Sequence, residues 1–124
     1  MSARTIWLFR IALFAAVAFA VTMALLPKPP HLPIDQFGDK FSHMLAFAAM
    51  ALLAALAYPQ MRLVRIGERL SFLGALVEVL QSIPALHRDC DIRDWVADTI
   101  AIVVVLVIVA TIRRRSGIVG KTIH

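Results

Sequence analysis

The sequence predicts an all-α membrane protein in which four transmembrane helices form one bundle. Hydrophobic residues make up 60% of the 124-residue chain, and its mean hydropathy is +0.81. An average soluble domain is only about half apolar. The apolar residues also gather in four blocks, each closed by proline or arginine. A chain of this length is expected to form a single domain, here residues 1–124.

The first block covers roughly residues 6–26 and is closed by the sequence PKPPHLP. Arg10 lies near its start, where a long side chain can reach back to the membrane interface. A cleaved signal peptide is an alternative, because the block has a basic start and small residues near Ala20 and Ala24. Its apolar stretch is long for a signal peptide, so we expect a retained helix.

The other three blocks cover roughly residues 41–58, 65–83 and 95–112. They are closed by Pro59, by Pro84 and by three arginines at 113–115. A helix that crosses a bilayer needs about 20 mostly apolar residues, with a range of roughly 17 to 25. The third block meets this length only marginally because it carries Glu68, Arg69 and Glu78. The second is rich in alanine, and since small residues let helices approach closely, we expect it at the centre of the bundle.

The basic residues predict the orientation of the bundle. Nine of the thirteen Lys and Arg residues lie at the two termini or between the second and third blocks. The positive-inside rule therefore places both termini in the cytoplasm. The connections before the second block and before the fourth block then face outward. Trp7, Tyr58 and Trp95 are expected to anchor the helix ends at the interfaces.

Polar residues gather at the outward-facing helix ends. The candidates for a ligand-binding pocket are Asp39, Lys40, His43, Glu78, Gln81, Asp91, Asp94 and Asp98. Residues three, four or seven positions apart share one face of a helix. By that spacing Asp39 lies with His43, Glu78 with Gln81, and the last three aspartates with one another.

Three of these groups lie at a similar depth, each roughly one turn inside its helix end: His43, Glu78 and Asp98. A lone ionisable group inside a membrane costs several kcal/mol unless it faces protein or water and finds a partner. One polar pocket shared by all three groups is a better explanation than three isolated groups, each with its own free-energy cost.

Structural roles are the alternative for several of the candidates. Asp39 and Asp94 are well placed to cap helix N-termini. His43 could be a polar residue satisfied between helices, and Gln81 could form an interhelical hydrogen bond. Glu78 and Asp98 each have apolar neighbours on both sides, and for these two we favour a functional role.

Other classes of function have little support in the sequence. The basic residues form no stripe interleaved with aromatics, so no nucleic-acid partner is expected. The chain has one cysteine, Cys90, which cannot form an intrachain disulfide. No Gly-rich phosphate loop, zinc-type Cys/His spacing or serine-nucleophile motif is present.

Three pieces of the chain resemble the VanZ-like family of small bacterial membrane proteins. They are DKFSH at 39–43, GALVEVLQSIP at 74–84 and RDCDIRDWVADTIA at 88–101. The family often has a glycine three residues after its last acidic or amide position, whereas this chain has Ala101 there. Alanine also permits a close contact, so we expect close packing of the fourth helix to survive. The resemblance implies a multi-pass protein of the bacterial inner membrane. The founding member is associated with teicoplanin resistance, a role that nothing in these residues transfers to this chain.

Three functions remain open from the sequence. In the first, the outward-facing pocket engages a lipid head group or a lipid-linked precursor of the cell envelope. Lys40 and His43 would contact phosphate, while the carboxylates accept hydrogen bonds or bind a cation. In the second, His43, Glu78 and Asp98 hold a divalent cation, and the protein is an enzyme acting on lipid phosphate. The third is a small proton-coupled transporter, which would depend on Glu78. The sequence leaves the oligomeric state open.

Overall fold

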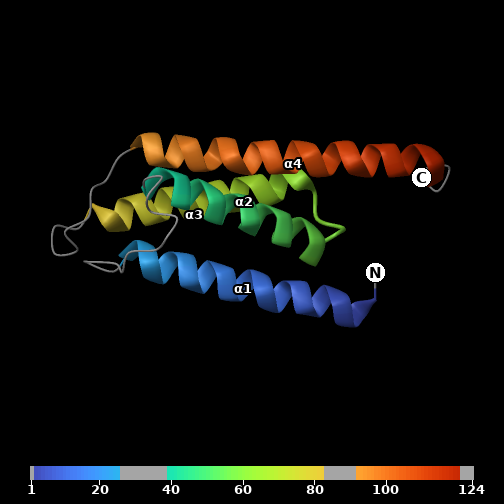
Figure 1. Cartoon of the computed structure of the whole chain (residues 1–124), viewed down its shortest axis with the longest axis horizontal. Helices are drawn as coiled ribbons and strands as arrows, with labels where there is room; N and C mark the ends of the chain where they lie inside the picture. The colour runs from blue at the N-terminus through green and yellow to red at the C-terminus, as the bar shows by residue number, and fades with distance from the viewer. Residues whose placement is uncertain (1, 26–38, 83–91, 121–124) are drawn as a thin grey trace.

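A computed structural model describes residues 2–25, 39–82 and 92–120, and in these ranges the chain is helical apart from short turns. The predicted all-α fold with four helices is confirmed. The helices are α1 (Ala3–Leu25), α2 (Asp39–Ala57), α3 (Leu63–Gln81) and α4 (Ile92–Gly120). Figure 1 shows that successive helices run in opposite directions along one long axis.

The helix ends follow local signals. Ser2 caps α1, because its Oγ accepts a hydrogen bond from the backbone N–H of Thr5 at 3.2 Å. α2 stops two residues before Pro59, as expected from the restriction that proline places on the residue before it. The fourth helix is longer than predicted, 29 residues instead of roughly 18, because it continues through the three arginines at 113–115. Arginine ends an apolar block, but it is a good helix former and does not end a helix.

The two ends of the bundle differ in character. Figure 1 places the first and last described residues at one end, together with the turn between α2 and α3. The opposite end is formed by the last turn of α1, the first turn of α2, the last turn of α3 and the first turn of α4. All the candidate pocket residues within the helices belong to this second end, which we call the acidic end.

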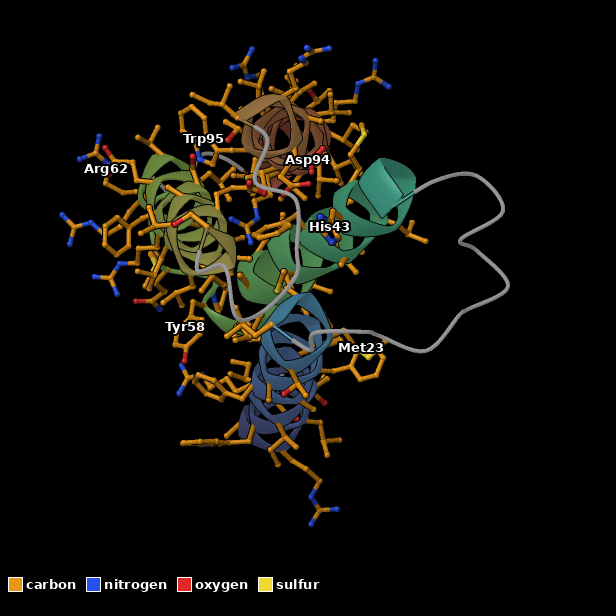
Figure 2. All side chains as sticks on the ribbon, turned by 90° about the vertical axis from the view of Figure 1, so that its left-hand side faces the viewer. Met23, His43, Tyr58, Arg62, Asp94 and Trp95 are labelled. Carbon is orange, nitrogen blue, oxygen red and sulfur yellow. The ribbon has the colours of Figure 1, made fainter. Side chains whose placement is uncertain are left out.

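α2 lies at the centre of the bundle, as its alanine content predicted. It packs against the other three helices, and its closest partners are α4 and α1. The view along the axis in Figure 2 shows α1 and α4 on opposite sides of α2. Ala51, Ala55 and Ala57 are fully buried, and Met50 is 1% exposed. Small side chains on α2 therefore let three neighbours approach its backbone at once.

Two arginines from neighbouring helices satisfy the last carbonyls of α2. The final carbonyls of a helix lack partners within it. Nε of Arg10 on α1 donates to the carbonyl of Ala57 at 3.0 Å. Nη2 of Arg113 on α4 donates to the carbonyl of Ala55 at 2.8 Å. The positive guanidinium groups also lie at the negative end of the α2 dipole, which stabilises both.

In the part of the chain that the structure describes, two helices are long and apolar enough to cross a membrane: α1 over its whole length, and α4 over Ile92–Arg115. Among the described residues, 43–57 of α2 form a shorter apolar helix. In the most apolar stretch of each helix, only 11% of the residues of α1 and 17% of those of α4 are buried. These two helices therefore turn most of their apolar surface away from the protein.

Candidate functional site

The acidic end of the bundle brings ionisable side chains of three helices together. His43 is in the second turn of α2, Glu78 lies in the last turn of α3, and Asp94 and Asp98 lie in the first two turns of α4. Figure 2 looks onto this end, with His43 on α2 and Asp94 on the neighbouring α4.

Glu78 and Asp98 are the two buried charged residues of the described chain, at 7% and 3% exposure. The packing of α3 explains the position of Glu78. A side chain at Gly74 would meet Phe47 of α2 and Trp95 of α4 at 3.4–3.7 Å, so this face of α3 points between those helices. Glu78 lies one turn further on, on the same face. It therefore enters the space between α2, α3 and α4.

Asp98 occupies the corresponding face of α4. It is four residues before Ile102, which is 1% exposed and part of the core. The carboxyl groups of Asp94 and Glu78 both lie close enough to Asp98 to interact with it electrostatically. This repulsion, added to burial, makes Asp98 an unfavourable place for an unaccompanied negative charge.

One oxygen of Asp98 has no hydrogen-bond partner among the residues that the structure describes. This atom, Oδ1, is also fully shielded from solvent. Most buried polar side-chain atoms in proteins have at least one hydrogen-bond partner, and each exception requires an explanation. A bound group that donates a hydrogen bond to Oδ1 would supply one.

The other two described members of the set are more accessible. His43 and Asp94 are both half-buried. Asp94 is an acidic residue in the first turn of α4, where it interacts favourably with the positive end of the helix dipole. The capping role considered for Asp94 is thus compatible with its position beside the buried acids.

The remaining predicted pocket residues are only partly described. The backbone of Asp39, Lys40 and Gln81 belongs to the first turn of α2 and the last turn of α3, hence to the acidic end. Their side chains, and the whole of Asp91, lie outside the described part of the chain.

The predicted metal-ligand set is not assembled. Within residues 2–25, 39–82 and 92–120, no three His, Cys, Asp or Glu side chains form a group that could hold a metal ion. His43, Glu78 and Asp98 therefore share one end of the bundle without forming such a group. The sequence gives depth along each helix, but not the distance between side chains on different helices.

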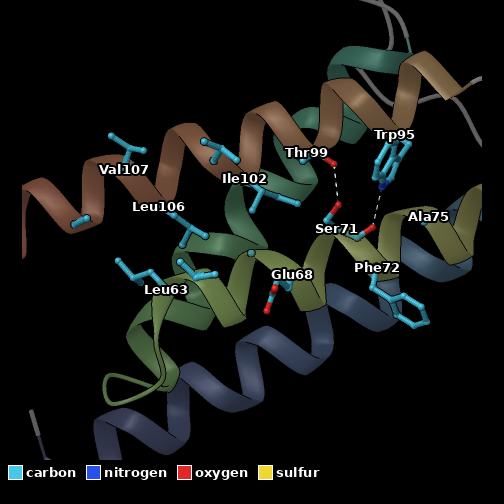
Figure 3. A pocket seen from close by; sticks show the side chains of 14 residues that line it. Leu63, Glu68, Ser71, Phe72, Ala75, Trp95, Thr99, Ile102, Leu106 and Val107 are labelled. Carbon is cyan, nitrogen blue, oxygen red and sulfur yellow. Dashed lines mark hydrogen bonds between the residues drawn. The ribbon is translucent and has the colours of Figure 1, made fainter.

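Sequence reasoning missed the hydrogen bonds that join α3 to α4. It assigned Trp95 the role of an anchor at the membrane interface. Its indole Nε1 instead donates to the backbone carbonyl of Ser71 on α3 at 2.9 Å. Ser71 Oγ lies 3.0 Å from Oγ1 of Thr99 on α4. These two contacts join α3 to α4 just below the acidic end, and Figure 3 shows both of them. Small and polar residues on α3 at a spacing of four were the available sequence signal.

Comparisons of this chain with protein-family models, with curated proteins and with solved structures found no match.

Proposed function

We propose that the chain is a VanZ-like protein of the bacterial inner membrane that crosses it four times, with both termini in the cytoplasm. In this proposal Glu78 and Asp98 engage the head group of a membrane lipid, or of a lipid-linked precursor of the cell envelope, at the outer face. The resemblance rests on the three sequence pieces at 39–43, 74–84 and 88–101.

The exposure of large apolar side chains supports a membrane location. On α1, Trp7 is 58% exposed, and Phe14 and Phe19 are each 59% exposed. On α3, Phe72 is 69% exposed. Apolar surface left in water costs about 25 cal/mol per Å², whereas in a bilayer the same surface meets hydrocarbon. Monomeric soluble proteins rarely expose large contiguous apolar patches.

The distribution of charge supports the orientation. Both arginines that cap α2, Arg10 and Arg113, lie near the end of the bundle that holds the first and last described residues. Arg62, Arg65 and Arg69 lie at the same end, at the start of α3. An excess of Lys and Arg is typical of the cytoplasmic ends of transmembrane helices. The acidic end then faces outward.

The chemistry of the buried acids supports a ligand that donates hydrogen bonds. Carboxylate oxygens accept hydrogen bonds, and a donor from a ligand would stabilise the ionised form of Asp98 that burial disfavours. Glu78 and Asp98 therefore suit the hydroxyl or ammonium groups of a head group. Lys40 begins α2 at the same end, and His43 follows it by less than one turn. Both residue types can contact a phosphate group that is attached to such a head group.

The observation that carries the proposal is Oδ1 of Asp98, which has no hydrogen-bond partner among the described residues and belongs to a side chain that is 3% exposed. Because a hydrogen bond to a charged group contributes about 1.5–3 kcal/mol, its loss would weaken binding by roughly 10- to 150-fold.

The test compares Glu78→Gln and Asp98→Asn with the wild-type protein purified in mild detergent. Native mass spectrometry would measure the apparent dissociation constants of phosphatidylethanolamine and of an undecaprenyl-phosphate-linked sugar. We expect both variants to bind at least one of these lipids about tenfold or more weakly than the wild type. The matched control is Thr22→Val, an isosteric change of an exposed residue on α1. Thr22 lies near the end of α1 that belongs to the acidic end of the bundle.

A stability measurement separates a binding role from a structural one. Asp98→Asn removes a carboxyl group whose charged form is disfavoured by burial and by the neighbouring Asp94 and Glu78. We therefore expect the thermal stability of the ligand-free variant to equal or exceed that of the wild type. Unchanged affinity for both lipids in both variants would contradict the proposal, as would a fall in stability that accounts for the lost binding.

A further inference from the structure

An apolar groove of about 730 Å³ runs between α3 and α4, from Trp95 beside the acidic end towards the opposite end of the bundle. This volume is within the range of roughly 300–1,000 Å³ that is typical of small-molecule sites. Figure 3 shows the groove from close by, with α4 above it and α3 below. Residues from Leu63 to Ala75 line it on α3, and residues from Trp95 to Ala110 line it on α4.

Small residues on α3 create the groove. Gly67, Ser71 and Ala75 follow one another at a spacing of four and all line it. The backbone at Gly67 lies so close to α4 that an added Cβ would be 3.2 Å from Cδ1 of Leu106. The two helix backbones therefore approach each other closely at the bottom of the groove. The small side chains of α3 leave the space above this contact unfilled.

The polar atoms at the bottom of the groove are paired with one another. The hydroxyl groups of Ser71 and Thr99 are hydrogen-bonded, and Trp95 Nε1 is bonded to the carbonyl of Ser71. The indole of Trp95 lines the end of the groove that lies nearer to the acids. Glu68 is the one charged residue among those that line it. A polar ligand would thus find few hydrogen-bond partners along most of the groove. A hydrocarbon chain has no hydrogen bonds to lose there.

The length of the groove matches one hydrocarbon chain. Leu63 and Ala75 are twelve residues apart, which is about 18 Å along a helix. One leaflet contributes roughly half of the 30 Å hydrocarbon core, about 15 Å. Leu63 and Ala110 line the end of the groove that lies towards the first and last described residues.

An arginine lies beyond this end of the groove. Arg114 is exposed and follows Ala110 by four residues, so it is on the same face of α4, one turn closer to the terminus. The next arginine, Arg115, is exposed as well but is turned by about 100° from that face. An arginine guanidinium is well suited to bind a phosphate group. A positive charge beyond one end of the groove and apolar side chains along it together fit a phospholipid.

We propose that the groove between α3 and α4 binds one acyl chain of an anionic phospholipid of the inner leaflet, whose phosphate group is held by Arg114. This inference rests on the membrane placement proposed above, and it does not depend on lipid binding at the acidic end.

The test uses the protein in vesicles of phosphatidylethanolamine that contain a small fraction of phosphatidylglycerol with a diazirine in its acyl chain. After irradiation, the crosslinked peptides are identified by mass spectrometry. Val103 and Val104 are neighbours on α4 and are each 51% exposed, but only Val103 lines the groove. We expect Val103→Trp to reduce labelling of the groove peptides by about fivefold or more, and Val104→Trp to leave labelling within about twofold of wild type.

The arginine variants test the head-group contact independently of groove filling. One basic residue near an anionic surface contributes an attraction equal to about fivefold in affinity. Arg114→Gln should therefore lower labelling by about that factor, and Arg115→Gln should change it less. Equal effects of both tryptophan variants, or labelling spread evenly around the helices, would overturn the proposal. Labelling of the groove peptides that is lost as the protein density in the vesicles is raised would assign the groove to a contact between two copies and would overturn it too.

The controls distinguish this inference from the function proposed above. Alkaline carbonate extraction tests the shared premise, because a protein released by carbonate is not embedded in the membrane. Glu78→Gln and Asp98→Asn should leave groove labelling at the wild-type level. In these variants, unchanged lipid binding at the acidic end would contradict only the proposed function, whereas absent or evenly spread labelling of the wild-type protein would contradict only this inference.

Discussion

Arg10 provides the sharpest test of how the bundle is held together at the end opposite the acidic end. From the sequence it counts as one of several orientation signals, but in the structure it makes three contacts. Its Nε donates to the carbonyl of Ala57 at 3.0 Å. Its guanidinium carbon lies 4.5 Å from the centroid of the Tyr58 ring and 5.0 Å from that of Trp7. α1 is therefore attached to the C-terminus of α2 through one side chain.

The magnitude follows from these contacts. A hydrogen bond made by a charged group contributes about 1.5–3 kcal/mol, and each partly exposed cation–π contact adds about 0.5–1 kcal/mol. Because contributions that share one side chain are not additive, we expect Arg10→Gln to reduce the free energy of unfolding by about 2–4 kcal/mol. Arg10→Lys should cost about half as much, since lysine keeps the charge but lacks the planar fork of donors.

The assay is unfolding by a denaturing detergent in mild micelles, followed by fluorescence of Trp7 and Trp95. Arg4→Gln and Arg4→Lys are the matched controls, because Arg4 is exposed and lies on the same helix. The lysine variants preserve the number of positive charges, so a loss of stability in Arg10→Lys cannot be a topology effect. Equal stabilities of the Arg10 and Arg4 variants would refute the argument that Arg10 caps α2.

Two further predictions concern the packing of the helices. Met50→Ala on α2 should cost about 2–5 kcal/mol in unfolding free energy because Met50 is 1% exposed, while Leu52→Ala, at 46% exposure, should cost well under half of that. A double-mutant cycle of Ser71→Ala and Thr99→Val should give a coupling energy of about 0.6 kcal/mol, and no more than about 1.7 kcal/mol, as for other interhelical hydrogen bonds in membrane proteins. A coupling energy of zero in the same unfolding assay would show that the two hydroxyl groups do not bind each other in solution.

Much of the fold could be predicted because its signals are local. Each apolar block became a helix, and three of the four helices begin and end within about three residues of the predicted limits. The alanines of α2 predicted its central place for a physical reason, since only small side chains allow three neighbours to approach one backbone. The C-terminal extension of α4 was not predicted, because hydropathy marks where a membrane ends and not where a helix does.

The candidate site could be predicted only in part. Glu78 and Asp98 were expected about one turn inside their helix ends, in largely apolar sequence, and in the structure both are buried. The acids were assigned correctly to one end of the bundle, because depth along a helix follows directly from residue number. Distances between helices do not follow from it, so the arrangement of His43 relative to the two acids could not be derived.

Contacts between distant parts of the chain were the least accessible to sequence reasoning. The hydrogen bond from Arg113 to Ala55 joins residues 58 positions apart. That from Trp95 to Ser71 depends on how closely α3 approaches α4. In both cases the residue type suggested an interfacial location, while its actual partner is a backbone carbonyl of another helix. Such partners become visible only when the packing of the helices is known.

The central claim is that a ligand group completes the hydrogen bonding of Asp98 beside Glu78. The most direct measurement is an experimental density map of the protein in lipid nanodiscs, at a resolution that shows lipid head groups. We expect non-protein density within hydrogen-bonding distance of Oδ1 of Asp98, between α2, α3 and α4. A map in which this oxygen is bonded by a side chain of the protein itself, with no space for a ligand, would contradict the claim.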